Sequence, residues 1–188
     1  EDSRVIAYML MDEPYVQDFP AVGQAVEFLY RNDRRGAIPI IDFRPNWSVP
    51  YQRWNMTYEE YVDRFIVECT PCVLINCHYA IMCDGSTRDV FYDNIEMFRR
   101  KAQQHDIGLM GFALVTALHL DNQQDYRAPS ESDLWWNVYS YLAYGAKGIW
   151  YYTYRHPGPK YEDGLVYRAP DQPAQDHHRA DKANAERA

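Results

Sequence analysis

Several features that would mark common classes of protein are missing from this sequence. No apolar run approaches the length needed to span a membrane. Positive charge is scarce, since the formal net charge is −8 and the pI is about 5.2. Nucleic acid and anionic membrane surfaces attract basic patches, so neither is expected as a partner. No Gly-x-Gly-x-x-Gly motif follows any apolar run, and there is no phosphate loop, which disfavours a Rossmann domain and a nucleotide site.

The chain begins at Glu1 without an initiator Met or a signal-peptide pattern. We therefore expect that preceding residues were removed or lie outside this sequence. With 188 residues and 47% hydrophobic residues, the chain can form one domain with a substantial core.

Cysteine is also sparse, and all four cysteines fall between residues 69 and 83. The pair Cys69 and Cys72 has a Cys-x-x-Cys spacing, but Cys72 and Cys77 enclose an apolar run that is typical of a strand. A metal or redox pair, a disulfide and structural thiols all remain possible, and structural thiols are the favoured interpretation.

Apolar runs alternate with amphipathic segments along residues 4–154. Helices are predicted at 22–30, 57–68, 91–102 and 131–146, two of them beginning at capping boxes formed by Thr57 with Glu60 and Ser130 with Asp133. Continuous apolar strands between helices indicate a parallel sheet that is buried on both faces. Strands are predicted at residues 4–10, 37–43, 72–79, 107–118 and 148–154.

The predicted strands end in polar and aromatic residues, whereas their opposite ends are plain, as in "GAKG". Ligands of parallel α/β proteins gather at the carboxyl ends of the strands. We therefore expect a functional site there, although loops are commonly polar in any protein. The ends are Asp12-Glu13-Pro14, "DFRPNW" from Asp42 to Trp47, "NCHY" from Asn76 to Tyr79, "TALH" from Thr116 to His119, and "TYRH" from Thr153 to His156.

The pair Asp12 and Glu13 is the best candidate for acid–base chemistry. Burial and a like-charged neighbour both raise the pKa of a carboxyl group, which suits a general acid. Adjacent strand residues point to opposite faces, so the two side chains converge only if the strand ends or bulges here. Pro14 supports an ending, because it cannot donate to the sheet ladder.

The motifs "DEP" at 12–14, "YDNIEMFRRKA" at 92–102 and "YRAPSESDLWWNVYSYLAYGAKGIWYYTY" at 126–154 resemble (β/α)8-barrel glycoside hydrolases. The most similar are the β-galactosidase-like barrels of polysaccharide-degrading bacteria. The resemblance covers most of residues 5–168, with the remaining residues 169–188 forming a polar terminal helix or tail. It implies a partial (β/α)8 TIM barrel that contains strands four to eight, while strands one to three lie elsewhere or in another chain. Without them, two strand edges and an open core are left.

The resemblance implies a secreted or periplasmic enzyme that cleaves a glycosidic bond in a poly- or oligosaccharide and needs no cofactor or metal. Glu13 matches the acid/base glutamate at strand four. The second carboxylate, expected at strand seven, is missing, and Cys77 occupies the position where strand six would carry an acid. The nucleophile therefore stays open among Asp12, Asp42, Asp121 and a substrate 2-acetamido group oriented by Asp12, because substrate-assisted families need no second carboxylate.

Further polar and aromatic residues are candidates for binding the substrate, although each also has a purely structural explanation. Arginine can form paired hydrogen bonds with a hydroxyl or a carboxylate, and Trp rings in loops can stack on sugars. Two other functions remain open: a glycan-binding protein without activity, and an assembly protein that docks through its open sheet edge. The candidate binding residues are Asp42, Arg44, Trp47, Trp54, His78, Tyr79, His119, Arg127 and Tyr154.

Overall fold

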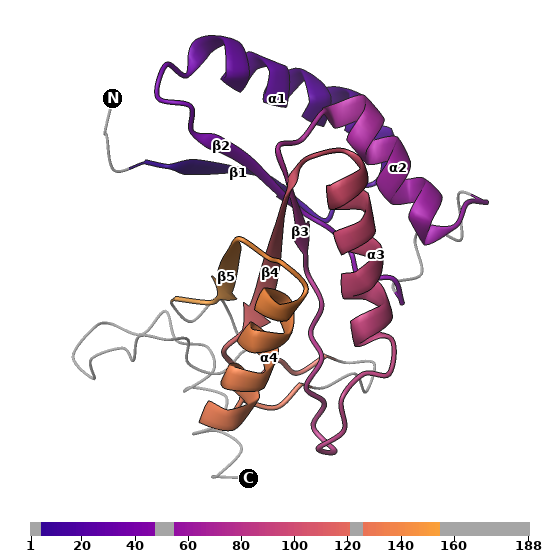
Figure 1. Ribbon diagram of the computed structural model, residues 1–188, viewed down its shortest axis with the longest axis vertical. Coiled ribbons are helices and arrows are strands. Elements are labelled where there is room, and N and C mark those ends of the chain that lie inside the picture. The colour runs from indigo at the N-terminus through magenta and orange to yellow at the C-terminus, as the bar shows by residue number, and fades with distance from the viewer. Residues whose placement is uncertain (1–4, 48–54, 121–125, 155–188) are drawn as a thin grey trace, which may run out of the picture.

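A computed structural model describes residues 5–47, 55–120 and 126–154 of this protein. Five parallel strands form one sheet in the order β1-β2-β3-β4-β5, and the sheet is shaped like half a barrel (Figure 1). A helix follows each of the first four strands, as expected for parallel neighbours joined by crossovers. The strands are β1 (Ala7–Asp12), β2 (Ile38–Asp42), β3 (Val73–Asn76), β4 (Gly108–Leu114) and β5 (Gly148–Tyr152). The helices are α1 (Phe19–Asn32), α2 (Tyr58–Cys69), α3 (Phe91–Gln104) and α4 (Glu131–Ala143), with a short 3-10 helix η1 (Val16–Asp18) before α1.

The predicted alternation of strands and helices is confirmed, and the two predicted capping boxes are present at the starts of α2 and α4. The differences lie at the element boundaries. Strand β3 ends at Asn76 rather than Tyr79, and β4 ends at Leu114 rather than Leu118. Helix α1 begins at Phe19 because Pro20 fits the first helical turn, where no backbone N–H is needed.

The main core lies between the sheet and the helices, which cover one face of the sheet (Figure 1). Aromatic rings dominate its centre: Phe43 of the β2 end packs edge-on against Phe65 of α2 at 4.6 Å and Phe98 of α3 at 5.3 Å between ring centroids. The opposite, concave face has a smaller cluster formed by Ile40, Ile75, Cys77 and Phe112. In a closed barrel this face would be the interior.

Burial on both faces, which was predicted for every strand, holds only for the centre of the sheet. Strand β3 is buried throughout, whereas β1 and β5 contain no fully buried residue. Met9 and Tyr151 are 44% and 45% exposed, and Ile6, just before β1, is 77% exposed. The reason is topological: in the described part of the chain β1 pairs only with β2 and β5 only with β4, so both are edge strands.

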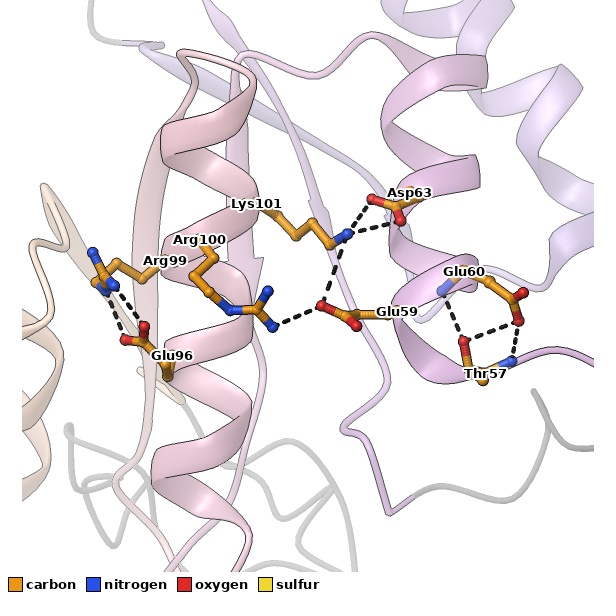
Figure 2. Close-up of polar contacts among 8 residues, drawn as sticks. All are labelled: Thr57, Glu59, Glu60, Asp63, Glu96, Arg99, Arg100 and Lys101. Carbon is orange, nitrogen blue, oxygen red and sulfur yellow. Dashed lines mark hydrogen bonds and ion pairs between the residues drawn. The ribbon is translucent and has the colours of Figure 1, made fainter.

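A polar network joins α2 to α3 (Figure 2). The Lys101 side chain is 10% exposed, and its Nζ lies 2.6 Å from Asp63 Oδ1 and 3.8 Å from Glu59 Oε1. Arg100 also reaches Glu59, at 2.7 Å. Because Lys101 is largely removed from water, its charge requires these partners, and the network fixes how the two helices lie against each other.

All four cysteines are described, and no disulfide links them. Cys69 and Cys77 are buried, which agrees with the interpretation as structural thiols. None of the helices in the described residues is long and apolar enough to cross a membrane. The predicted tail at 169–188 lies outside the described residues.

Candidate functional site

A cavity of about 650 Å³ opens on the concave face, where the carboxyl ends of the strands meet. This is the edge at which the sequence predicts a site. Aromatic side chains form much of its wall, and three carboxyl groups lie on one side of it. The lining residues are Met9, Asp12, Glu13, Asp42, Arg44, Pro45, Trp47, Cys77, Tyr79, Phe112, Leu118, Leu120, Tyr126, Trp150, Tyr151, Tyr152, Thr153 and Tyr154.

Asp12 and Glu13 both line this cavity, as the proposed acid–base pair requires. Strand β1 ends at Asp12, and its register with β2 shifts between Met9 and Met11. Glu13 then adopts a left-handed conformation with φ of 47°, which is uncommon for a residue other than glycine. These irregularities break the strict alternation of the strand, so that two neighbouring carboxyl groups can face one cavity.

Glu13 is paired with Arg44, whose Nη1 lies 3.1 Å from Glu13 Oε2. Burial raises the pKa of Glu13, Arg44 opposes this increase, and the neighbouring Asp12 adds to it. Arg44 itself lies over the ring of Tyr15, 4.8 Å from the ring centroid. Glu13 is thus a carboxyl group that takes up a proton more readily than usual, and the position of Arg44 controls how readily.

Asp42 is the most buried of the three carboxyl groups, at 3% exposure. It pairs in register with Asp12 across β1 and β2. Burial raises the pKa of Asp42 to about 7, with further contributions from Asp12 and Glu13. Asp42 Oδ1 is buried and has no hydrogen-bond partner among the described residues. Asp42 therefore keeps its proton to a higher pH than an ordinary carboxyl group does.

Two buried tyrosines of α2 hold the loops that carry these groups. The Tyr61 hydroxyl donates to the Pro14 carbonyl at 2.6 Å, and the Tyr58 hydroxyl donates to the Arg44 carbonyl. Each hydroxyl satisfies a carbonyl just beyond a strand end and so fixes the backbone beside Glu13 and Arg44. Neither tyrosine was predicted as a site residue, because in sequence both belong to the apolar face of an amphipathic helix.

The aromatic wall is held together by Arg88, which sequence reasoning also missed. Its guanidinium carbon lies 4.1 Å from the Trp47 ring centroid and 5.7 Å from that of Tyr126. Arg88 also donates to the Tyr126 hydroxyl at 3.0 Å. These residues come from the loops after β2, β3 and β4, so one cation joins three loops around the cavity. A lone arginine in a polar loop carries no signal that would identify this role from sequence.

Three predicted binding residues do not line the cavity. His78 is buried on the helix side, where Nδ1 lies 2.9 Å from Asn94 Oδ1 of α3, and burial lowers its pKa to about 4. Arg127 binds Asp133 at 2.5 and 3.0 Å and thereby supports the start of α4. His119 is exposed. These positions favour structural roles for His78 and Arg127.

Cys77 lies in the cavity wall at the position where the resembled family suggests an acid. Burial raises the pKa of its thiol well above the ordinary value, and the carboxyl groups of Asp42, Glu13 and Asp12 raise it further. The thiol is therefore neutral and cannot replace a carboxylate nucleophile. Trp54, Asp121 and His156, which the sequence also offers as candidates, lie outside the described residues.

Among the described residues, no three His, Cys, Asp or Glu side chains are arranged to hold a metal ion. The site's chemical capacity comes from its carboxyl groups: proton transfer by Glu13, and hydrogen bonding or charge attraction by the pair Asp12 and Asp42. The aromatic wall offers flat apolar surfaces with polar edges.

Comparison of the chain with models of known protein families finds no match, and comparison with curated proteins finds no relative.

Proposed function

We propose that this protein is part of a (β/α)8-barrel glycoside hydrolase that cleaves an O-glycosidic bond in a poly- or oligosaccharide. The observation that carries the proposal is the placement of Glu13. It is a carboxyl group with a raised pKa, at the carboxyl end of a parallel strand, in a cavity of about 650 Å³ with aromatic walls. The motif resemblance to β-galactosidase-like barrels points in the same direction.

In this proposal Glu13 acts as the general acid and base. Its protonated form donates to the glycosidic oxygen as the bond to the sugar breaks, and its ionised form then takes a proton from the attacking water. Arg44 favours the ionised form, so substrate binding that weakens the 3.1 Å contact between Arg44 and Glu13 promotes protonation. Asp12 orients the sugar, or a 2-acetamido group that serves as the nucleophile. Tyr79, Trp47 and Tyr154 offer surfaces on which sugar rings stack.

The proposal includes completion of the barrel. Among the described residues β1 pairs only with β2 and β5 only with β4, and the concave face exposes apolar side chains such as Met9. Further strands, from preceding residues or from another chain, would satisfy both edges and close the cavity. We also propose that the complete protein acts outside the cytoplasm, secreted or in a periplasm, where polysaccharides are degraded.

The test is the hydrolysis of aryl glycosides by the full-length gene product and its Glu13→Gln variant. We expect the variant to lose about 10²- to 10⁴-fold in kcat, because the amide cannot transfer the proton. Glu27→Gln is the matched control, since Glu27 forms an exposed ion pair with Arg31 on α1 and should leave the rate unchanged. Unchanged turnover by a folded Glu13→Gln variant would remove Glu13 from the mechanism.

A second candidate function is glycan binding without hydrolysis, and Cys77 specifically favours it. A neutral thiol stands where the resembled family suggests an acid, so a double-displacement reaction has no evident nucleophile at this position. This candidate predicts measurable affinity for oligosaccharides with no turnover. Tyr79→Ala would weaken binding, whereas Glu13→Gln would leave it intact.

A further inference from the structure

Arg88 lies behind the wall of the cavity, in contact with two residues that form it. Arg88 is partly buried and does not line the cavity, whereas Trp47 and Tyr126 both do. Its guanidinium group meets the rings of these two residues, the Tyr126 hydroxyl and the sulfur of Met82. No carboxylate of the described residues forms an ion pair with Arg88. An ion pair therefore does not explain why an arginine stands at this position.

The contacts of Arg88 fix the ring of Trp47. The guanidinium carbon lies 4.1 Å from the Trp47 ring centroid, close enough to cover one face of the ring. Trp47 is partly exposed and lines the cavity, so its remaining surface is available to a ligand. Arg88 itself is held at two points: its side chain donates to the Tyr126 hydroxyl at 3.0 Å, and its backbone N–H donates to the Ala80 carbonyl at 2.9 Å.

Tyr126 is a firm anchor for this contact. It is 1% exposed, and its backbone exchanges two hydrogen bonds of 2.9 Å with Leu118. Its ring packs edge-on against Tyr79, at 5.4 Å between centroids. Arg88 thus connects Trp47, in the loop after β2, to a tyrosine that is fixed against the loops after β3 and β4.

The aromatic side of the cavity is separated from Glu13. Beyond Tyr79, the wall continues through Phe112 of β4 at 5.7 Å and Tyr152 of β5 at a further 6.0 Å between centroids. Adjacent strands lie about 4.8 Å apart, so β3 to β5 lie roughly 10–20 Å from β1 along the sheet. This separation is longer than one sugar ring. A ligand that contacts both Glu13 and the aromatic wall must therefore contain more than one ring.

We propose that Arg88 is a positioning residue for a second sugar subsite, in which the Trp47 ring stacks on a sugar neighbouring the one whose bond is cleaved beside Glu13. This inference rests on the proposed function. Arg88 contacts no sugar itself, but it holds the ring that does. The preferred substrate is then an oligosaccharide, and Arg88 contributes to its binding without taking part in proton transfer.

The experiment compares a short and a long substrate of the full-length gene product. The resemblance to β-galactosidase-like barrels selects nitrophenyl galactoside and an unmodified galactose tetrasaccharide as probes. We expect Arg88→Met to raise KM for the tetrasaccharide roughly threefold to thirtyfold, as loss of a cation–π contact implies, with kcat unchanged. Both constants for nitrophenyl galactoside should stay as in the wild type, because this substrate does not reach the second subsite.

Two further variants complete the comparison. Arg88→Lys keeps the cation but not the planar group, so it should recover part of the loss of affinity. Arg64→Met is the matched control, since Arg64 forms an ion pair with Glu68 on the surface of α2 and should leave both substrates unaffected.

The fluorescence of Trp47 gives a readout that needs no substrate. The difference between the emission of each protein and that of its Trp47→Phe counterpart isolates the emission of Trp47. We expect this emission to shift to longer wavelength in Arg88→Met, because the ring loses the guanidinium group and gains contact with water. An unchanged emission would overturn the positioning role.

The outcomes separate this inference from the proposed function. Equal effects of Arg88→Met on both substrates, a lowered kcat, or no effect on either would overturn the subsite while leaving hydrolysis by Glu13 intact. If the wild type binds the tetrasaccharide but cleaves nothing, calorimetric dissociation constants replace KM. Weaker binding by Arg88→Met would then support the subsite and count against the enzyme, whereas unchanged binding would overturn the subsite. A wild type that neither binds nor cleaves either probe would overturn both.

Circular dichroism of each variant establishes that it is folded. If Arg88→Met does not fold, Tyr126→Phe tests the same arrangement, because it removes the hydroxyl to which Arg88 donates. It should raise KM for the tetrasaccharide by a smaller factor and leave nitrophenyl galactoside unaffected. An equal effect on the two substrates, or none on the tetrasaccharide, would count against the subsite.

Discussion

Asp42 should make the stability of this protein fall as the pH rises from about 4 to about 7. Its pKa is raised from 3.8 to about 7, chiefly by burial and then by Asp12. Between these two values the folded state binds a proton that the unfolded state has released, so the free energy of unfolding decreases with increasing pH. At about 1.4 kcal/mol for each pH unit, the loss between pH 4 and pH 7 amounts to up to about 4 kcal/mol. That is a large share of the 5–15 kcal/mol typical of a domain.

The variant Asp42→Asn tests this dependence on pH, because asparagine keeps the shape of the side chain but cannot ionise. Urea unfolding at pH 4, 6 and 8 gives the free energy of unfolding of each variant. We expect the wild type and Asp42→Asn to differ little at pH 4, and Asp42→Asn to be the more stable at pH 8 by up to about 4 kcal/mol. Asp89→Asn, which removes a charge from an exposed loop position, should follow the wild type throughout. If Asp42→Asn showed the same dependence on pH as the wild type, ionisation of Asp42 would not be the cause of the loss of stability.

Two further predictions concern packing and are measured by urea unfolding at one pH. Lys101→Met keeps the apolar stem but removes the charge that binds Asp63, so it should lower the free energy of unfolding by about 1–2 kcal/mol. Lys147→Met, at an exposed position, should change the free energy of unfolding little. A change near zero for Lys101→Met would mean that the network in Figure 2 does not stabilise the contact between α2 and α3. Gly111→Ala should lower the free energy of unfolding by about 1–3 kcal/mol, because the added Cβ would lie 2.3 Å from Tyr141 Cγ. The same change at Gly108, where the nearest atoms are 3.4 Å away, should lower it less. Equal effects at the two glycines would contradict the close packing of α4 on β4.

The alternation of strands and helices was predictable because local patterns determine it. Thr57 and Ser130 mark helix starts through a side-chain contact three residues away, which is visible in sequence. The ends of the strands could not be predicted from local patterns in the same way. Leu118 continues the apolar run of β4, yet it instead pairs with Tyr126 in an isolated bridge. Apolar periodicity cannot separate a strand residue from a buried loop residue that follows it.

The candidate site was predictable to the extent that strand ends converge at one edge of a parallel sheet. That rule brought Asp12, Glu13 and Asp42 together correctly, along with Arg44 and Tyr79. The rule failed for His78. Successive residues beyond β3 still point alternately to the cavity and to the helices, and the sequence alone did not show which residues point which way. Arg88 and the tyrosines of α2 depend on contacts between segments far apart in the chain, which no local pattern encodes.

If Glu13 supplies the proton to the glycosidic oxygen, as proposed, the loss of rate on replacing Glu13 must depend on the leaving group of the substrate. The measurement is the rate of glycoside cleavage by the wild type and by Glu13→Gln, for an activated aryl glycoside and for an alkyl glycoside of the same sugar. A good leaving group needs little protonation, so we predict a much larger loss of rate for the alkyl glycoside than for the activated one. Equal losses for both substrates, or no loss for either, would contradict proton donation by Glu13.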